Sequence, residues 1–406
     1  MKSKMMLKKR KRVFVAMSGG VDSSVTALLL KNEGYDVVGV FMRCFNIDGC
    51  QDRDAEDARR VAEKLGIPFY VWDFEDEYKK KVVKYMVDGY RSGITPNPDV
   101  MCNKEIKFGL FFDRAIALGA DYISTGHYVR LVTDANNAKK TRIMRKGLDS
   151  RHSHGFALNS HRLFQAEDSN KDQSYFLWTL TQKQLARCLF PIGDYLKPEV
   201  RAIARKARLP TADKKDSQGI CFLGKVSISD FLKQYIRPKR GEILTIAGEK
   251  IGRHEGVYFY TIGQRHLGVS NLKSKISKGK GDQKPFYVSE KNIETNTLTV
   301  AEGEKNKALY KKEIELIDVN FLNPAICDKL PVIVYARVRY RQPLGKARLV
   351  ARDKRQGKKM GGRNFLSPVA GHWSLIFAKP QKFVASGQSA VFYLKSGEML
   401  GGGIIL

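Results

Sequence analysis

The stretch Val13-Phe-Val-Ala-Met-Ser-Gly-Gly-Val-Asp-Ser-Ser24 decides the fold of the first part of this chain. Its apolar run predicts a strand at Val13–Met17, the two glycines predict a tight turn, and a helix is expected from about Asp22 to Glu33. Glycines at such a turn let backbone N–H groups point at a ligand, and the positive end of the helix dipole favours an anion there. The stretch therefore predicts a phosphate-binding loop. The alternative is structural: a tight connection in which Asp22 or Ser23 serves only as the helix N-cap.

Strand and helix patterns keep alternating after this loop. Further strands are expected at Val37–Met42, Phe69–Trp72 and Tyr122–Thr125, and helices at Arg53–Leu65, Glu75–Tyr90, Lys104–Leu118, Gln173–Phe190 and Lys197–Ala207. Such alternation is typical of parallel βαβ units, so it predicts an α/β domain with a doubly wound parallel sheet. The polar, basic stretch 131–172 interrupts the alternation and is expected to be a long insertion and not a folded unit.

The pattern changes after about residue 228. Short β-rich segments stand between glycine turns, at Glu242–Ile246, Val257–Thr261, Phe286–Ser289, Thr297–Ala301, Val332–Arg339 and Ala390–Leu394. This spacing predicts small all-β barrels or sandwiches. We expect three domains: an α/β domain at 1–228, a central small β domain at 229–288 and a C-terminal β-barrel domain at 289–406.

Composition limits the class of protein. The 406 residues include 72 Lys+Arg and 42 Asp+Glu, a net charge of +30, which favours a polyanionic partner such as nucleic acid unless the source lineage has basic proteins in general. No apolar run approaches the ~20 residues of a membrane span, and no signal segment follows the basic first residues. Six cysteines without a Cys-x-x-Cys pair indicate a reducing compartment, so a cytoplasmic protein is expected.

Two cysteines lie in settings that suit a nucleophile. Cys102 follows a Pro-Asn-Pro-Asp stretch directly before the predicted helix, near two lysines, and Cys221 lies in a glycine-flanked loop with cations close by. A thiol in either place is expected to have a lowered pKa. No other cysteine stands at ligand spacing, so no zinc or other metal site is expected from spacing. An iron–sulfur cluster on Cys102, Cys221 and Asp99, which would leave no spacing signature, stays open. For a single cysteine the alternative is a small buried side chain, the interpretation we keep for Cys44, Cys188 and Cys327.

The motifs together resemble a known family. The loop lacks the lysine of a P-loop and the spacing of a dinucleotide motif, and it resembles the pyrophosphate loop of N-type ATP pyrophosphatases. With Thr95–Phe108, Thr125–Tyr128, Lys171–Phe176, Asp216–Gly224, Tyr260–Arg265, Arg339–Gln342 and Gly387–Tyr393, nearly the whole chain resembles the tRNA-specific 2-thiouridylases. The departures are the basic first dozen residues, the longer stretch at 131–170, and the basic loops at 270–284 and 352–363.

The resemblance implies ATP with Mg²⁺ as cofactors and a tRNA substrate. It assigns nucleotide binding to Ala16, Met17, Ser18, Gly19, Gly20, Val21, Asp22, Ser23, Met42 and Gly126. It implies that the C2 oxygen of the wobble uridine is adenylated and that sulfur arrives as a persulfide on Cys221. Cys102 is then the second catalytic thiol, and the two thiols end as a disulfide. A persulfide-donor protein is the implied partner, and the chain is expected to act as a monomer.

The resemblance also implies the RNA contacts. Asn97, Pro98 and Asp99 are expected at the target base, with Asp99 as a general acid or base. Lys171, Asp172, Gln173, Arg339 and Tyr340 are expected to contact the tRNA. The alternation of Arg337, Arg339 and Arg341 on a predicted strand further suggests one phosphate-binding face. For His127 we favour a structural or nucleotide-lining role.

Two other functions remain open from the sequence alone. One is an ATP pyrophosphatase that acts on a small metabolite, which would need neither Cys102 nor Cys221 and no basic β domains. The other is a nucleic-acid-binding protein whose nucleotide loop is a relic and which does not turn over ATP.

Overall fold

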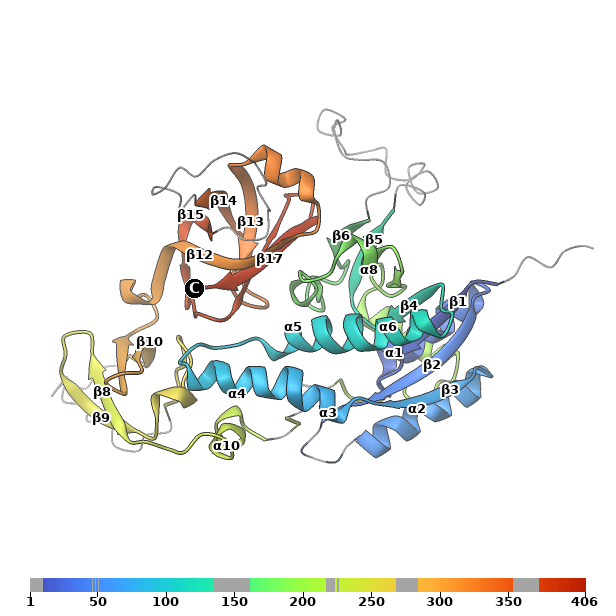
Figure 1. Cartoon of the computed structure of the whole chain (residues 1–406), viewed down its shortest axis with the longest axis horizontal. Helices are drawn as coiled ribbons and strands as arrows, with labels where there is room; N and C mark the ends of the chain where they lie inside the picture. Colours follow the sequence, from blue (N-terminus) through green and yellow to red (C-terminus); the bar gives the residue numbers. More distant parts are fainter. Residues whose placement is uncertain are drawn as a thin grey trace, which may run out of the picture. The chain divides into compact units, whose positions relative to one another are not determined.

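The computed structural model describes residues 10–45, 47, 49, 51–133, 161–216, 223–224, 226–267, 284–352 and 372–406. The chain folds into two compact units (Figure 1). The first unit consists of residues 1–79, 99–224 and 397–399, and the second of residues 80–98, 225–396 and 400–406. Cys221, Cys50 and most of the basic insertions lie outside the described residues.

The first unit is built on the predicted parallel sheet. Its five strands stand in the order β3-β2-β1-β4-β7 and every neighbouring pair is parallel. The strands are β1 (Arg12–Ala16), β2 (Asp36–Arg43), β3 (Phe69–Asp73), β4 (Tyr122–Thr125) and β7 (Cys188–Leu189), and the helices α1 (Val21–Asn32), α2 (Gln51–Leu65) and α9 (Lys197–Lys206) belong to the same unit. Val13 and Val15 of β1 are fully buried, and Phe14, on the opposite face, is only 5% exposed, as expected for a central strand covered on both faces. The predicted fold class is confirmed.

The helical stretch that contains Cys102 begins earlier than predicted. It runs through α5 (Pro98–Cys102), a π-helix (Asn103–Leu110) and α6 (Phe111–Ala117), so the start expected at Lys104 is wrong. Pro98 is the first helical residue, a position where the missing N–H of proline costs nothing. Cys102 is thus the fifth residue of α5. It does not stand directly before the helix, the position that the sequence predicted.

Three further predictions of local structure need correction. The helix expected at Glu75–Tyr90 exists, but a π-helix at Lys79–Val83 separates α3 (Glu75–Tyr78) from α4 (Lys84–Arg91). The helix expected at Gln173–Phe190 is replaced by a 3-10 turn at Ser174–Phe176, the short α8 (Gln182–Leu185) and β7. The stretch 131–172 is not wholly without structure, because β5 (Val129–Val132) pairs with β6 (Arg162–Gln165).

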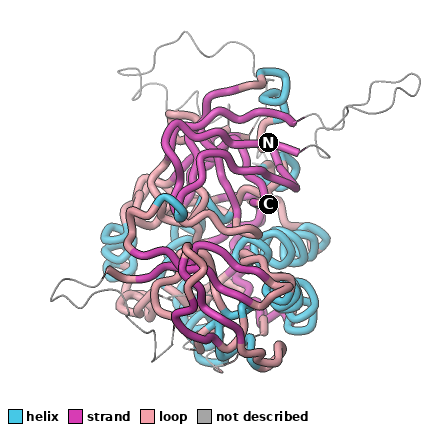
Figure 2. The backbone as a smooth tube through the Cα atoms, turned by 90° about the vertical axis from the view of Figure 1, so that its left-hand side faces the viewer, coloured by secondary structure: helices cyan, strands magenta, loops and turns pink. Residues whose placement is uncertain are grey.

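The second unit contains two β structures. A four-stranded sheet has the order β10-β11-β8-β9, and a six-stranded closed barrel has the order β12-β15-β14-β13-β16-β17. Their strands, magenta in Figure 2, are β8 (Gly241–Thr245), β9 (Lys250–His254), β10 (Phe286–Asn292), β11 (Thr297–Glu302), β12 (Tyr310–Phe321), β13 (Val332–Arg337), β14 (Gly345–Arg352), β15 (His372–Lys382), β16 (Ser389–Tyr393) and β17 (Met399–Ile405). The short helix α10 (Ile228–Lys233) precedes them. The strand expected at Val257–Thr261 is wrong, because Val257–Phe259 forms a 3-10 turn.

The arginines expected on one strand face do not share it. Strand β13 ends at Arg337, whose side chain is buried, and Arg339 and Arg341 lie in the turn that follows. Arg341 has a φ of +63°, a left-handed conformation that no strand contains. The alternating pattern therefore continues past the real end of the strand. Among the helices of the described residues, none is long and apolar enough to cross a membrane.

Candidate nucleotide and catalytic site

The loop between β1 and α1 has the geometry of an anion site. Gly20 is the N-cap residue of α1 and makes no side-chain capping bond, so neither Asp22 nor Ser23 is the N-cap of the structural alternative. Ser23 Oγ instead accepts the backbone N–H of Ser18 at 3.1 Å and braces the loop from within. Gly19 has a φ of +71°, and a Cβ there would lie 2.2 Å from the backbone oxygen of Asp54. The N–H groups in the first turn of α1 have no acceptor within the helix and are available to an anion.

Met42 and Gly126 flank this loop on its two sides. Strands β2 and β4 both pair with β1, and Val40 and Thr125 lie opposite Ala16 in register. Because the carboxyl ends of parallel strands meet at one edge of the sheet, the residues just beyond these pairs lie beside the loop. A Cβ at Gly126 would lie 2.8 Å from the backbone nitrogen of Ser23. The sheet therefore brings the predicted nucleotide residues Ala16–Ser23, Met42 and Gly126 together.

The carboxylate of Asp22 is the most strongly bonded group of the loop. Its Oδ1 accepts the hydroxyl of Tyr128 at 2.7 Å, and Lys197 Nζ donates to Oδ1 and Oδ2 at 2.8 and 2.9 Å. Lys197 is itself buried, and its backbone N–H donates to Asp168 Oδ2 at 2.9 Å. The negative charge of Asp22 also raises the pKa of Tyr128, in addition to the effect of burial, so that hydroxyl stays protonated. Lys197 could not be predicted as a partner of Asp22, because the two residues are 175 positions apart along the chain.

Asp216 forms ion pairs with three cations, one of which is Lys197. Its carboxylate contacts Lys171 Nζ at 2.6 Å, Lys197 Nζ at 2.8 Å and Arg201 at 2.8 Å. Burial alone would raise the pKa of Asp216, but hydrogen bonds from Lys171 and Lys197 hold it at about 2. Asp216 is therefore ionised at neutral pH. It is the last described residue before the segment that contains Cys221.

The residues of this site fit ATP and Mg²⁺. A glycine cradle with free helix N–H groups suits phosphates, and Asp22 offers a carboxylate next to them. Within the described residues no group of three or more His, Cys, Asp or Glu could hold a metal ion by itself. Mg²⁺ does not need such a cage, because it commonly binds through one or two carboxylates together with substrate phosphates and water.

A second group of candidate residues lies in α5 and just after β4. Cys102 is buried and Asp99 is half-buried. Burial raises the pKa of Asp99 to about 6, against the opposing effect of the Lys107 cation. His127 follows Gly126, and burial together with Lys107 lowers the pKa of this imidazole well below its usual range. His127 Nδ1 lies 2.7 Å from Thr125 Oγ1, so a neutral, hydrogen-bonded ring agrees with the structural role favoured above.

The residues predicted to contact tRNA differ in how their side chains are buried and bonded. Asp172 is only 2% exposed, and its carboxylate accepts N–H groups of Ala166, Ser174 and Gln165 in its own loop. Gln173 is bonded to Tyr128 on both sides: its Oε1 accepts the Tyr128 N–H, and its backbone N–H donates to the Tyr128 carbonyl, each at 3.0 Å. The ammonium of Lys171, bound to Asp216, remains partly exposed.

The other predicted RNA residues belong to the second unit. Arg339 lies over the ring of Phe383 at 5.9 Å, and Tyr340 is half-buried beside it in the turn. Asn97 is buried, and Pro98 follows it at the start of α5. The backbone just before them is held by Gln388, whose Nε2 donates to the carbonyls of Thr95 and Pro96 at 3.0 and 3.1 Å.

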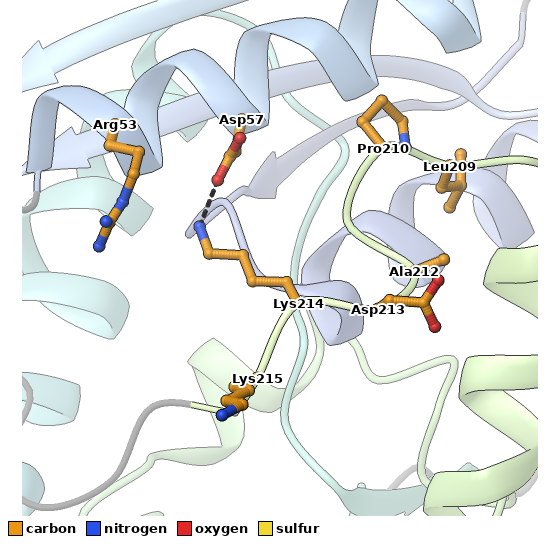
Figure 3. A pocket seen from close by; sticks show the side chains of 8 residues that line it. All are labelled: Arg53, Asp57, Leu209, Pro210, Ala212, Asp213, Lys214 and Lys215. Carbon is orange, nitrogen blue, oxygen red and sulfur yellow. Dashed lines mark hydrogen bonds and ion pairs between the residues drawn. The ribbon is translucent and has the colours of Figure 1, made fainter.

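A hollow of about 520 Å³ lies between α2 and the segment 209–215 (Figure 3). Lys214 extends into it toward α2, where its Nζ contacts Asp54 at 2.7 Å and Asp57 at 2.5 Å. The other residues that line it are Arg53, Leu209, Pro210, Ala212, Asp213 and Lys215. Both acidic and basic side chains therefore line the hollow.

A parallel sheet with this glycine loop between β1 and α1 defines a nucleotide-binding α/β domain of the ATP-pyrophosphatase class, followed by β domains. Family models agree: "tRNA methyl transferase HUP domain" matches residues 11–225, "tRNA methyl transferase PRC-barrel domain" 229–302 and "Aminomethyltransferase beta-barrel domain" 366–405. The chain is 42% identical over 402 residues to the tRNA-specific 2-thiouridylase MnmA of Bacillus velezensis, covering 97% of this chain and 94% of the relative. The chain belongs to the tRNA-specific 2-thiouridylase family.

Other relatives agree with this assignment. The enzyme of the same name from Streptococcus mutans is 41% identical, with 97% of this chain and 95% of the relative covered. A tRNA-specific 2-thiouridylase of Geobacillus kaustophilus is 43% identical, with 95% and 93% covered. Among solved structures, a 4-thiouridine synthetase–RNA complex with bound ATP is similar at a TM-score of 0.33 and 16% identity, covering 55% of this chain and 50% of that chain.

Proposed function

We propose that this protein is an ATP-dependent tRNA-uridine 2-sulfurtransferase that replaces the C2 oxygen of the wobble uridine by sulfur. The observation that carries the proposal is the Asp22 loop, flanked by Met42 and Gly126 at the sheet edge, in a chain of which 97% aligns with a 2-thiouridylase. The N–H groups of this loop bind the ATP phosphates. Asp22 holds Mg²⁺, which, when bound, neutralises phosphate charge as pyrophosphate leaves.

The first step activates the base. Asp99 removes the proton from N3 of the uridine, and the C2 oxygen attacks the α-phosphate of ATP, so that a uridine adenylate forms and pyrophosphate leaves. A carboxylate with a pKa of about 6 is suited to this task, because it is ionised at neutral pH yet still basic enough to take a proton. Asn97 and Pro98, directly before Asp99, position the base.

The second step transfers sulfur. The terminal sulfur of a persulfide on Cys221 attacks C2 and displaces AMP, which is a far better leaving group than the original oxygen. Cys102 thiolate then attacks the Cys221 sulfur, forming a Cys102–Cys221 disulfide and releasing 2-thiouridine, which regains its N3 proton from Asp99. Both cysteines are oxidised and the transferred sulfur is reduced to the sulfide level. An external thiol reductant supplies the two electrons that reopen the disulfide.

The remaining roles are RNA binding, loading of sulfur and the division of the chain into domains. Lys171, Arg339 and Tyr340 contact the tRNA backbone, whereas the bonding of Asp172 and Gln173 supports a role in holding the loop of Lys171. We place the catalytic domain at 1–228. Because β10 and β11 pair in one sheet with β8, we end the central β domain at 302 instead of 288 and begin the barrel domain after it. A persulfide-donor protein loads Cys221, one chain suffices for the reaction, and the cysteine pattern supports a cytoplasmic setting.

Reconstitution tests the proposal. The purified protein is incubated with unmodified tRNA, ATP, Mg²⁺, a persulfide donor and a thiol reductant, and the tRNA nucleosides are identified by mass spectrometry. We expect 2-thiolated uridine from the wobble position, formed only when ATP is present. ATP turnover without sulfur in RNA would favour the small-metabolite enzyme, and RNA binding without ATP turnover would favour the binding protein. A parallel reaction with a methyl donor checks the activity named by the family models.

A further inference from the structure

Four charged side chains of the first unit form a continuous chain of ion pairs. Asp22 contacts Lys197, Lys197 contacts Asp216 Oδ1 at 2.8 Å, and Asp216 Oδ2 contacts Lys171 at 2.6 Å. Each pair is at hydrogen-bond distance. Lys197 is shared between two carboxylates, and Asp216 binds Arg201 in addition to Lys197 and Lys171. A change of charge at one end therefore changes the strength of the next pair along the chain.

The ends of this chain are accessible and its inner lysine is not. The side chains of Asp22 and Lys171 are 30% and 32% exposed, whereas that of Lys197 is 10% exposed. Ligands can thus reach both ends without displacing Lys197. The backbone N–H of Lys197 also donates to Asp168, which holds this residue in place. The Lys197 ammonium can therefore bind Asp22 less strongly and Asp216 more strongly with little movement.

We propose that this chain of ion pairs makes the binding of Mg²⁺–ATP and of tRNA mutually favourable. The inference rests on the proposed function, which puts ATP phosphates at Asp22 and an RNA phosphate at Lys171. When Mg²⁺ and phosphates occupy Asp22, this carboxylate neutralises less of the Lys197 charge, and Lys197 attracts Asp216 more strongly.

The effect then passes to the other end. Asp216, more strongly held by Lys197, holds Lys171 less strongly, so the Lys171 ammonium is freer to pair with an RNA phosphate. By thermodynamic linkage, RNA on Lys171 must strengthen ATP binding by the same factor. Asp216 is well suited to this role because it stays ionised across the physiological pH range.

Paired binding titrations test this inference. The dissociation constant of a non-hydrolysable ATP analogue with Mg²⁺ is measured by calorimetry, without RNA and with saturating unmodified tRNA. For the wild type we expect RNA to tighten analogue binding by at least about fivefold, the lower end of typical coupling between sites. For Asp216→Asn we expect this ratio to fall toward one, and Asp216→Glu, which keeps the charge, should restore much of it.

A matched control lies three residues away. Asp213 is in the same segment and, among the described residues, pairs with Arg205 at the surface, at 2.8 Å and 76% exposed, so Asp213→Asn should keep the wild-type ratio. If the wild type binds both ligands but RNA does not change the affinity for the analogue, the coupling is overturned and the proposed function stands. A wild-type ratio of affinities in Asp216→Asn would have the same meaning. A wild type that binds neither ligand would refute the proposed function itself. The wild-type result decides even if Asp216→Asn does not fold.

Discussion

The charge of Asp22 offers the sharpest perturbation of the nucleotide site. Asp22→Asn keeps the size of the side chain and an acceptor for the Tyr128 hydroxyl, but it removes the anion that pairs with Lys197 at 2.8 and 2.9 Å. Hydrogen bonds to charged groups contribute about 1.5–3 kcal/mol and neutral ones about 0.5–1.5 kcal/mol. The variant should therefore lose about 1–2 kcal/mol of stability in the first unit. Lys197 keeps Asp216 as a partner, so the unit should still fold.

The effect on chemistry should be larger than the effect on folding. Removing one preorganised electrostatic group from a reacting centre typically costs about 10²–10³ in rate. We expect tRNA-dependent pyrophosphate release to fall by about this factor, with no loss of tRNA affinity. The assay is coupled pyrophosphate detection with a filter-binding control. Asp36→Asn, at a surface pair with Arg12, is the matched control and should behave as wild type. Pyrophosphate release at the wild-type rate in Asp22→Asn would refute the reasoning.

Three further predictions concern the acid–base group, the thiols and the RNA contacts. The rate of adenylation should rise with pH through about 6, because Asp99 must lose its proton to act as a base, and stopped-flow pH profiles should show this limb vanish in Asp99→Asn. Cys221→Ser should form the adenylate without ever carrying a persulfide, whereas Cys102→Ser should carry the persulfide yet release no product. Peptide mass spectrometry locates the persulfide, and finding it on Cys102 would contradict these roles. Arg339→Ala should weaken binding of every substrate tRNA and reduce the salt slope by about one, and a loss limited to one tRNA would indicate base recognition instead.

Local sequence was enough to predict the architecture of the first unit. The order strand, Gly-Gly turn, helix around Gly19 specifies its own geometry, because only glycine tolerates the φ of +71° and the close approach of Asp54. The alternation of strands and helices then fixed a parallel sheet. Boundaries were less predictable: the helix start expected at Lys104 leaves Pro98 outside the helix, although proline also suits the first residue of a helix.

The electrostatic surroundings of the site could not be predicted. Lys197 pairs with Asp22 across 175 residues, and no spacing pattern in a single sequence records such a contact. Asp172 belongs to the motif expected to contact tRNA, but a motif does not record whether a side chain faces RNA or its own loop. Only the structure shows that the Asp172 carboxylate is turned inward. Arg341 fits the alternating arginine pattern of the sequence. The left-handed backbone at this residue shows that no strand continues there. Such features depend on tertiary packing, which overrides local periodicity.

The central claim is that the C2 oxygen of the wobble uridine is adenylated at the Asp22 loop. It can be tested with a tRNA whose target uridine carries a heavy oxygen isotope at C2, in a single turnover with ATP and a persulfide donor. We predict that the heavy oxygen appears in the phosphate group of the released AMP, in an amount equal to the 2-thiouridine formed. Thiolated tRNA accompanied by unlabelled AMP would contradict the claim.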